Sequence, residues 1–170
     1  PDMPLSDLSK FKGYIQTDGY TGYTHLAEAN GITHLSCWAH ARRYFDKALN
    51  NDKARAMYAL EKIQQLYAIE RGCDERDDPP DKRQEYRRRE SVPILDGLEQ
   101  WLKTEINVVA PKSPIGTAIA YTLGLWPRLR AYTLDGRYLI DNNRIENTIR
   151  PLAIGRKNYL FAGSDRGAQQ

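Results

Sequence analysis

The sequence is poor in cysteine and has no long apolar run. Its 170 residues contain two cysteines, Cys37 and Cys73. Two cysteines do not make the disulfide framework of a small secreted protein, so a reducing compartment is the default expectation. No apolar stretch approaches the roughly 20 residues of a membrane-spanning helix, and no secretory signal is recognisable. We therefore expect a cytoplasmic protein with no membrane partner.

The chain also lacks a strong excess of one charge. It has 25 Lys and Arg residues against 22 Asp and Glu residues, a net charge of +3, and this balance does not by itself indicate nucleic-acid binding. The distribution is more informative, because basic residues gather near the end of the chain. Residues 141–170 hold Arg144, Arg150, Arg156, Lys157 and Arg166 against Asp141, Glu146 and Asp165.

The order of predicted elements indicates an α/β protein that is rich in helix. Residues 11–17 and 32–38 are predicted strands, and residues 23–31 and 39–49 are predicted helices. A strand–helix–strand–helix order is typical of parallel strands joined by a helical crossover. With 41% hydrophobic residues, the chain suits one domain with a substantial core, or one core with an insertion.

The middle of the chain is predicted to be entirely helical. Residues 53–71 are amphipathic, with a predicted buried side formed by Met57, Leu60, Ile63 and Tyr67. Residues 72–81 are charged and contain two prolines, which favours a loop. Residues 82–91 are predicted to form a solvated polar helix.

The second half of the helical region has recognisable helix starts. Ser91 is predicted to cap one helix and Ser113 another, each with a proline in the first turn. Pro127 is predicted to kink or break the second of these helices. We therefore divide the chain into residues 1–50, an all-helical insertion at 51–135, and residues 136–170.

Two acids are candidate catalytic residues. Asp18 follows the first predicted strand, and ligands gather at the carboxyl ends of parallel strands. The commoner role of an Asp-Gly pair is a simple turn. Glu146 lies on a short predicted helix, four residues before Arg150. It would either form a surface ion pair with Arg150 or direct its carboxylate toward the strand ends and Asp18. Two converging carboxylates would suit Mg²⁺ or Mn²⁺.

The segment Cys37-Trp38-Ala39-His40 has the spacing of half a zinc site. A structural zinc site needs four ligands, and Cys73, His25 and His34 do not form a matching pair. A buried cysteine and a hydrogen-bonded histidine fit this segment better.

The basic residues fall into two groups. Arg87–Arg89 lie on the predicted polar helix and are interpreted as a solvated face. The others accompany the two acids and suit a polyanionic substrate. These candidate DNA-binding residues are Arg42, Arg43, Arg150, Arg156 and Lys157.

Four segments in order resemble the bacterial transposases of insertion-sequence family sixty-six. They are GYIQTDGYTGY, CWAHARRYFDKAL, PKSPIGTAIAYTL and DNNRIENTIRPLAIGRKNYLFAGSDRGA. The resemblance implies an RNase-H-like core with an Asp-Asp-Glu triad, in which Asp18 matches the second acid and Glu146 the third. It also implies that Cys37 and His40 match a Cys-x-x-His signature between these acids, and that the helical block is an insertion before the glutamate.

The first aspartate of such a triad lies on the first strand of the core, and neither Asp2 nor Asp7 has that context. The resemblance therefore implies a catalytic-domain fragment whose RNase-H-like core lacks its first strands, and which is inactive when isolated. We expect the side-chain oxygens of Asp18 and Glu146 to lie roughly 4–8 Å apart, given the spacing of paired metal ions.

The predicted function is metal-dependent cleavage and strand transfer of DNA during transposition. The expected cofactor is Mg²⁺ or Mn²⁺, and the expected partners are insertion-sequence ends, target DNA and a second copy of the protein, at the nucleoid. One alternative is a non-catalytic DNA-binding or assembly module derived from a transposase. A glycosidase built on two carboxylates is the other, and the surrounding arginines argue against it.

Overall fold

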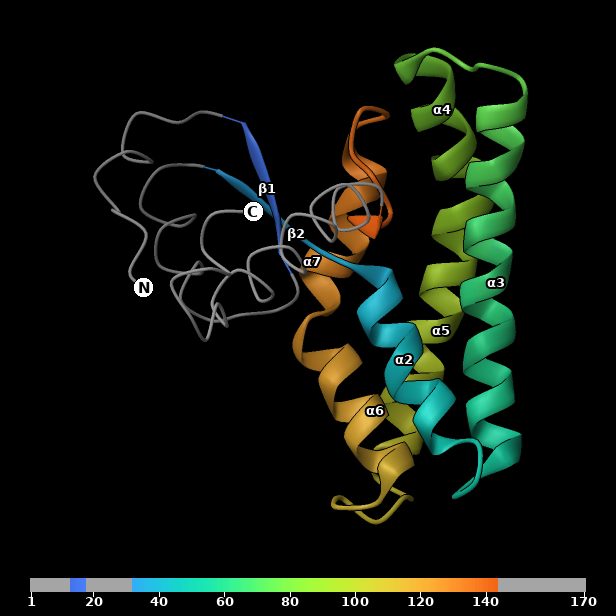
Figure 1. Ribbon diagram of the computed structural model, residues 1–170, viewed down its shortest axis with the longest axis vertical. Coiled ribbons are helices and arrows are strands. Elements are labelled where there is room, and N and C mark those ends of the chain that lie inside the picture. Colours follow the sequence, from blue (N-terminus) through green and yellow to red (C-terminus); the bar gives the residue numbers. More distant parts are fainter. Residues whose placement is uncertain (1–12, 18–31, 144–170) are drawn as a thin grey trace, which may run out of the picture.

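The computed structural model describes residues 13–17 and 32–143. Within them, two short strands lie beside an elongated group of helices (Figure 1). Strand β1, Tyr14–Thr17, and strand β2, Thr33–Ser36, are parallel, with Tyr14 opposite Thr33 and Thr17 opposite Ser36. The predicted parallel pairing is confirmed, and both strands lie inside their predicted ranges, but the prediction of strand as far as Trp38 is wrong because Trp38 begins the helix that follows.

Two long helices follow the sheet. Helix α2, Trp38–Ala48, begins directly after β2 and buries one side, formed by Trp38, Ala41, Phe45 and Ala48. Helix α3, Lys53–Glu75, returns alongside α2. Its first turn is capped by Asp52, whose carboxylate accepts a hydrogen bond from the Arg55 N–H at 3.1 Å.

The predicted loop at 72–81 is wrong in most of its length, because α3 continues to Glu75 and helix α4, Pro80–Tyr86, begins at the second proline. A π-helical segment, Arg87–Ser91, then joins α4 directly to helix α5, Val92–Glu105. Ser91 makes no capping hydrogen bond, so the predicted helix start there is also wrong. The helix needs no cap at this point because its backbone is already helical.

The start of the next helix and the break near Pro127 agree with the sequence patterns. Helix α6, Pro114–Gly124, is capped by Ser113, whose hydroxyl accepts from the Gly116 N–H at 3.0 Å. A break before Pro127 then separates α6 from helix α7, Trp126–Arg130, as predicted. A 3₁₀ turn, Ala131–Leu134, ends the helical region.

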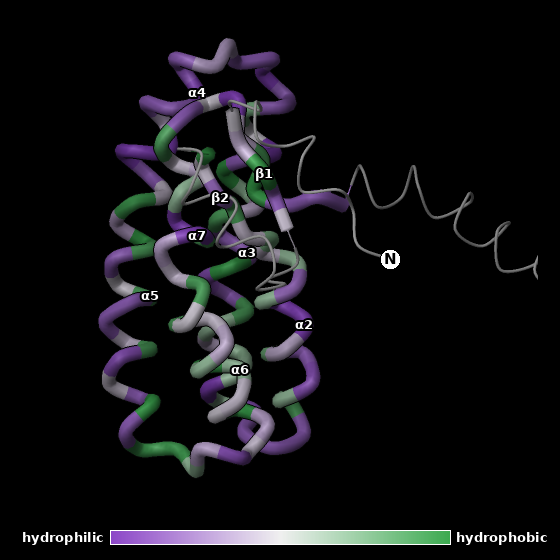
Figure 2. The backbone as a smooth tube through the Cα atoms, turned by 90° about the vertical axis from the view of Figure 1, so that its left-hand side faces the viewer, coloured by the Kyte–Doolittle hydropathy of each residue, from purple (hydrophilic) through white to green (hydrophobic). Residues whose placement is uncertain are grey.

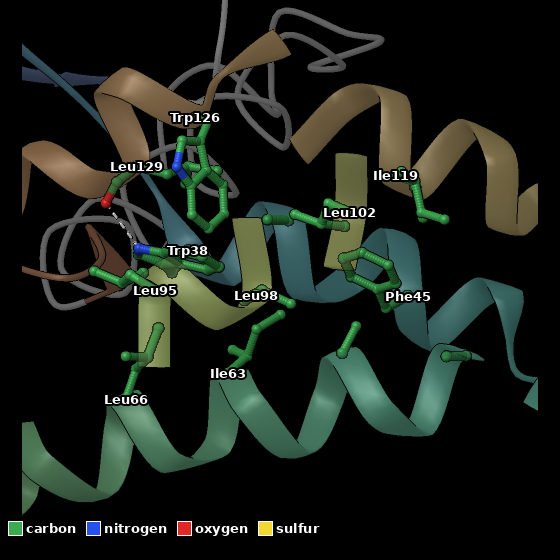
Figure 3. Close-up of a cluster of buried hydrophobic side chains, with 14 of the residues drawn as sticks. Trp38, Phe45, Ile63, Leu66, Leu95, Leu98, Leu102, Ile119, Trp126 and Leu129 are labelled. Carbon is green, nitrogen blue, oxygen red and sulfur yellow. Dashed lines mark hydrogen bonds between the residues drawn. The ribbon is translucent and has the colours of Figure 1, made fainter. Parts of the chain in front are cut away.

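One core joins the helices. Figure 3 shows side chains of α2, α3, α5, α6 and α7 meeting in it, and Figure 2 shows apolar positions recurring along the same helices. The Trp38 indole crosses the core and donates a hydrogen bond to the Leu129 carbonyl at 2.9 Å. Helix α2 therefore packs in the same core as the helices of residues 51–135. No helix in the described ranges is long and apolar enough to cross a membrane.

The predicted buried side of α3 is wrong in its details. Met57 is 40% exposed, whereas Ala56 and Ala59 are fully buried together with Ile63 and Leu66. Small side chains face the core here because α3 packs closely against α2 and α5. The larger Leu60 and Tyr67 lie at the margin of the core and are partly buried.

The predicted solvated face at Arg87–Arg89 is wrong for its first residue. Arg87 is fully buried, whereas Arg88 and Arg89 are exposed. Local sequence could not separate these three arginines, because the partner that neutralises Arg87 is Glu70 on another helix.

Candidate functional site at the ends of the strands

The predicted site residues divide between described and undescribed parts of the chain. Asp18, Glu146, Arg150, Arg156 and Lys157 lie outside the described residues. The other four are described, and all lie on or just before α2: Cys37, His40, Arg42 and Arg43. The site can therefore be built from the residues that flank the two acids.

The carboxyl ends of the two strands lie beside the segment 139–143. Thr17, the residue before Asp18, ends β1 opposite Ser36 of β2. The Gln16 amide on β1 donates to the Leu139 carbonyl at 3.0 Å. Just beyond β2, the Trp38 N–H donates to the Ile140 carbonyl at 3.2 Å. Backbone that leads toward Glu146 is thus fixed next to the strand that leads into Asp18.

Asp141 fixes this segment to α3. Its carboxylate accepts a hydrogen bond from the Tyr67 hydroxyl at 2.8 Å and from the Asn143 N–H at 3.0 Å. Burial, and then the negative charge of Asp141, raise the pKa of Tyr67, so the phenol remains a donor at neutral pH. The sequence did not single out Asp141 for this role, because Tyr67 lies 74 positions away and no local pattern links the two.

Cys37 is the residue before α2, and His40 lies in the first turn of that helix. Cys37 is 2% exposed, and burial raises the pKa of its thiol, so it is a poor nucleophile and a poor metal ligand as it stands. The His40 N–H donates to the Cys37 carbonyl at 3.2 Å. Within residues 13–17 and 32–143, no group of three or more His, Cys, Asp or Glu side chains is placed so that it could hold a metal ion.

A basic hollow opens between α2 and α3, next to Asn143. Its volume is about 420 Å³. The lining residues are Ala39, Arg42, Arg43, Leu60, Gln64, Tyr67, Arg71 and Asn143. The hollow brings the two predicted α2 arginines beside residues that the sequence did not single out, Gln64 and Arg71. Their two helices are separated in sequence, so only the α2–α3 pairing reveals the cluster.

Arg87, on the π-helical segment, holds the chain that leads into the segment 139–143. Its guanidinium donates to both carboxylate oxygens of Glu70, at 2.8 and 2.7 Å. It also donates to the carbonyls of Tyr132, Asp135 and Tyr138, at 2.7, 2.7 and 2.8 Å. Five hydrogen bonds use the whole donor capacity of an arginine. Residues 132–138 are therefore fixed to α3 and to the π-helical segment.

The chain matches a family model. The model for the Transposase IS66 family covers residues 2–170. Three curated proteins of Sinorhizobium fredii are similar over almost the whole chain. The uncharacterized protein y4qI is 36% identical over an alignment of 179 positions, which covers 99% of this chain and 32% of that protein.

The two other relatives have the same proportions. The uncharacterized protein y4hP is 32% identical over 99% of this chain and 33% of its own length. The uncharacterized protein y4jD is 33% identical over 95% of this chain and 33% of its own length. The chain thus spans about a third of the length of the curated relatives it matches. No solved structure matches it significantly.

Proposed function

Because the chain belongs to the IS66 family of transposases, we propose that it contributes two metal-binding acids and a phosphate-binding surface to a transposase that cuts and joins DNA. The acids are Asp18 and Glu146. The proposed core is RNase-H-like, and its helical block at 51–135 is an insertion between these acids.

One observation carries this proposal. The segment 139–143 lies at the carboxyl ends of β1 and β2, held there by Gln16 and by the Trp38 N–H. Asp18 is the next residue after β1, and Glu146 follows Asn143 by three residues. The described chain thus ends near one edge of the sheet both before Asp18 and before Glu146, which are 128 positions apart, and this supports a shared carboxylate site.

The chemistry of the proposed donors fits a hard divalent cation. Carboxylate oxygens are the ligands that Mg²⁺ and Mn²⁺ prefer. When bound, such ions activate an attacking oxygen and stabilise the leaving oxygen of an in-line phosphoryl transfer. In this proposal water attacks the phosphodiester at the element end and displaces a 3′-hydroxyl. That 3′-hydroxyl then attacks a phosphodiester of target DNA, where it forms the new bond and displaces the 3′-oxygen of the target strand.

The basic residues have a separate role in the proposal. Arg42 and Arg43 on α2, with Arg150, Arg156 and Lys157, hold DNA phosphates and keep the reacting strand in place. Two metal ions need a further acid that we assign to none of the 170 residues. We therefore expect these residues alone to bind DNA without transferring strands.

The test is a Mg²⁺-dependent strand-transfer assay on the full-length protein. We expect Asp18→Asn and Glu146→Gln each to abolish transfer while leaving DNA binding in place. The matched control is Glu61→Gln, which neutralises an exposed acid on α3 and should leave transfer unchanged. Full activity of Glu146→Gln would show that the glutamate is misassigned. DNA binding without any transfer by the unaltered protein would instead favour a non-catalytic module.

A further inference from the structure

The basic hollow between α2 and α3 has the charge of an anion site. Three arginines line it, Arg42 and Arg43 from one helix and Arg71 from the other, and none of its lining residues is acidic. Its volume of about 420 Å³ falls within the range of roughly 300–1,000 Å³ that is usual for ligand pockets. A smaller neighbouring hollow of about 150 Å³ shares Tyr67 and Arg71 with the basic hollow. Its other charged lining residues are Arg83 and three acids, Glu70, Asp74 and Asp141, so it lacks the purely basic lining.

Two arginines of the basic hollow, Arg42 and Arg71, are not held in strong internal ion pairs within the described residues. Arg42 contacts Asp46 at 3.7 Å, and both side chains are well exposed, at 55% and 38%. Exposed pairs of this kind contribute little, about 0–1 kcal/mol. Arg71 is exposed and forms no ion pair within the described ranges. Guanidinium groups in such a setting bind phosphate oxygens in a bidentate manner.

The position of the hollow identifies the strand that it would hold. Asn143 lines it and is held by Asp141, in the segment that leads to Glu146. Tyr67 lines it from the other helix and donates to Asp141. The hollow is therefore continuous with the proposed catalytic edge, and a DNA strand that leaves this edge would pass directly over α2 and α3.

We propose that this hollow binds a backbone phosphate of DNA next to the reacting phosphodiester, with Arg71 and Gln64 as contacts alongside Arg42. The inference rests on the proposed function, and it assigns to the helical block a direct share in substrate binding. The recognised chemistry is a phosphodiester, which either duplex DNA or an unpaired strand can supply.

A pair of adjacent substitutions on α3 tests the position of the site. Gln64 lines the hollow, whereas the neighbouring Gln65, which is also exposed, does not. Gln64→Glu places a carboxylate beside the bound phosphate, and Gln65→Glu makes the same change of net charge one residue away. We expect Gln64→Glu to weaken binding of a fluorescent 20-base DNA by about fivefold to tenfold more than Gln65→Glu, from the repulsion of close charges.

The second test uses the salt dependence of DNA binding. The slope of log K against log[salt] is negative, and Arg71→Gln should make it shallower by about 0.7–0.9, which corresponds to the loss of one phosphate contact. Arg88→Gln, at an exposed arginine on the π-helical segment, removes the same charge outside the hollow and should change the slope less. Both a duplex and the matching single strand are titrated, and circular dichroism checks that each variant is folded.

The outcomes separate this inference from the proposed function. A selective effect of Gln64→Glu and Arg71→Gln in either titration supports the hollow and shows which form of DNA fills it. Equal effects of each variant and its control, in both titrations, would overturn the hollow as a site while leaving the proposed function intact. If the unaltered chain bound neither DNA in a salt-dependent way, the phosphate-binding part of the proposed function itself would fail.

Discussion

At the scale of single residues, Arg87 and Glu70 form a buried ion pair. Both are buried, at 0% and 6% exposure, and Glu70 also accepts from Arg83 at 3.3 Å. A buried pair is tolerated only when its charges and hydrogen-bonding groups are fully satisfied. Arg87 meets this condition through its carboxylate partner and three carbonyls, so its role is to fix residues 132–138, which lead into the segment 139–143.

Replacing Arg87 by methionine should strongly destabilise the protein. The change leaves the Glu70 carboxylate buried without its main partner, which typically costs about 3–5 kcal/mol. Arg88→Met, next to it but exposed, should stay within about 0.5 kcal/mol of the unaltered protein. Urea unfolding followed by circular dichroism measures both. Equal stabilities of the two variants would show that the buried pair contributes nothing net.

His34 should make stability depend on pH. Burial, and then the positive charge of Arg128, lower its pKa below the ordinary value of 6.5, and its ring nitrogen lies 2.8 Å from the Thr17 hydroxyl. The folded state therefore binds a proton less readily than the unfolded state, so this contribution is complete above pH 6.5 and is lost as the pH falls through the folded pKa.

The corresponding measurement compares unfolding free energies at pH 7.5 and 5.5. The unaltered protein should lose more stability over this interval than His34→Gln, because the variant has no group at this position that titrates there. Carboxylates common to both proteins cancel in the difference. An identical loss in both proteins would contradict the assigned direction of the shift.

At the scale of elements, the helices pack at close range where small residues permit it. Ala56 and Ala59 of α3 face the core, and Gly116 in the first turn of α6 lies against the backbone carbonyl of Ala110. Gly97, in contrast, is exposed in the middle of α5 with nothing within 4 Å of an added methyl group. A side chain at Gly116 would therefore collide with the backbone, whereas a side chain at Gly97 would meet no neighbour.

Alanine substitutions at these glycines should have opposite signs. Gly97→Ala should stabilise the protein by roughly 0.5–1 kcal/mol, because alanine is the better helix former and meets no neighbour. Gly116→Ala should destabilise it by roughly 1–3 kcal/mol, because the methyl group must displace the carbonyl of Ala110. Thermal unfolding of the two variants decides the matter, and a rise in Tm for Gly116→Ala would show that the 110–116 turn yields easily.

Sequence patterns located most helices and strands well, but they misplaced the junction between α4 and α5 and the buried face of α3. Periodicity and turn residues predicted β1, β2, α2 and the Ser113 cap because those signals are local. The π-helical join between α4 and α5 carries no such signal, since Ser91 followed by Pro93 is an ordinary helix start. The buried face of α3 was misassigned because periodicity weighs large residues such as Met57, whereas close packing selected alanines.

At the scale of the whole molecule, the candidate site depends on contacts across long sequence separations. The sequence predicted Asp18 and Glu146 from their positions and motifs, and Arg42 and Arg43 from their neighbours in the chain. It did not reveal Arg71 or Tyr67, because they join the site only through the pairing of α3 with α2 and the 139–143 segment. Asp18 and Glu146 remain predictions from their positions in the sequence and from the family resemblance, whereas the tertiary structure shows which described residues lie beside the 139–143 segment.

The strands also lead to a prediction about assembly. Within the described ranges the sheet has two strands, and each strand has one strand neighbour. Unpaired N–H and C=O groups along a strand recruit other chains. We therefore expect the chain to self-associate through its strands, or to cover them with its own remaining residues. Light scattering over a range of concentrations distinguishes these two arrangements.

Amide hydrogen exchange of residues 14–17 and 33–36 completes the measurement. Self-association through strands should raise the scattering mass and slow exchange together as the concentration rises, with little effect of salt, because backbone pairing is not screened as surface charges are. Intramolecular cover should give a monomer whose strand amides exchange slowly at every concentration. A monomer whose strand amides exchange rapidly would contradict both arrangements, since an open strand edge would then persist without a partner.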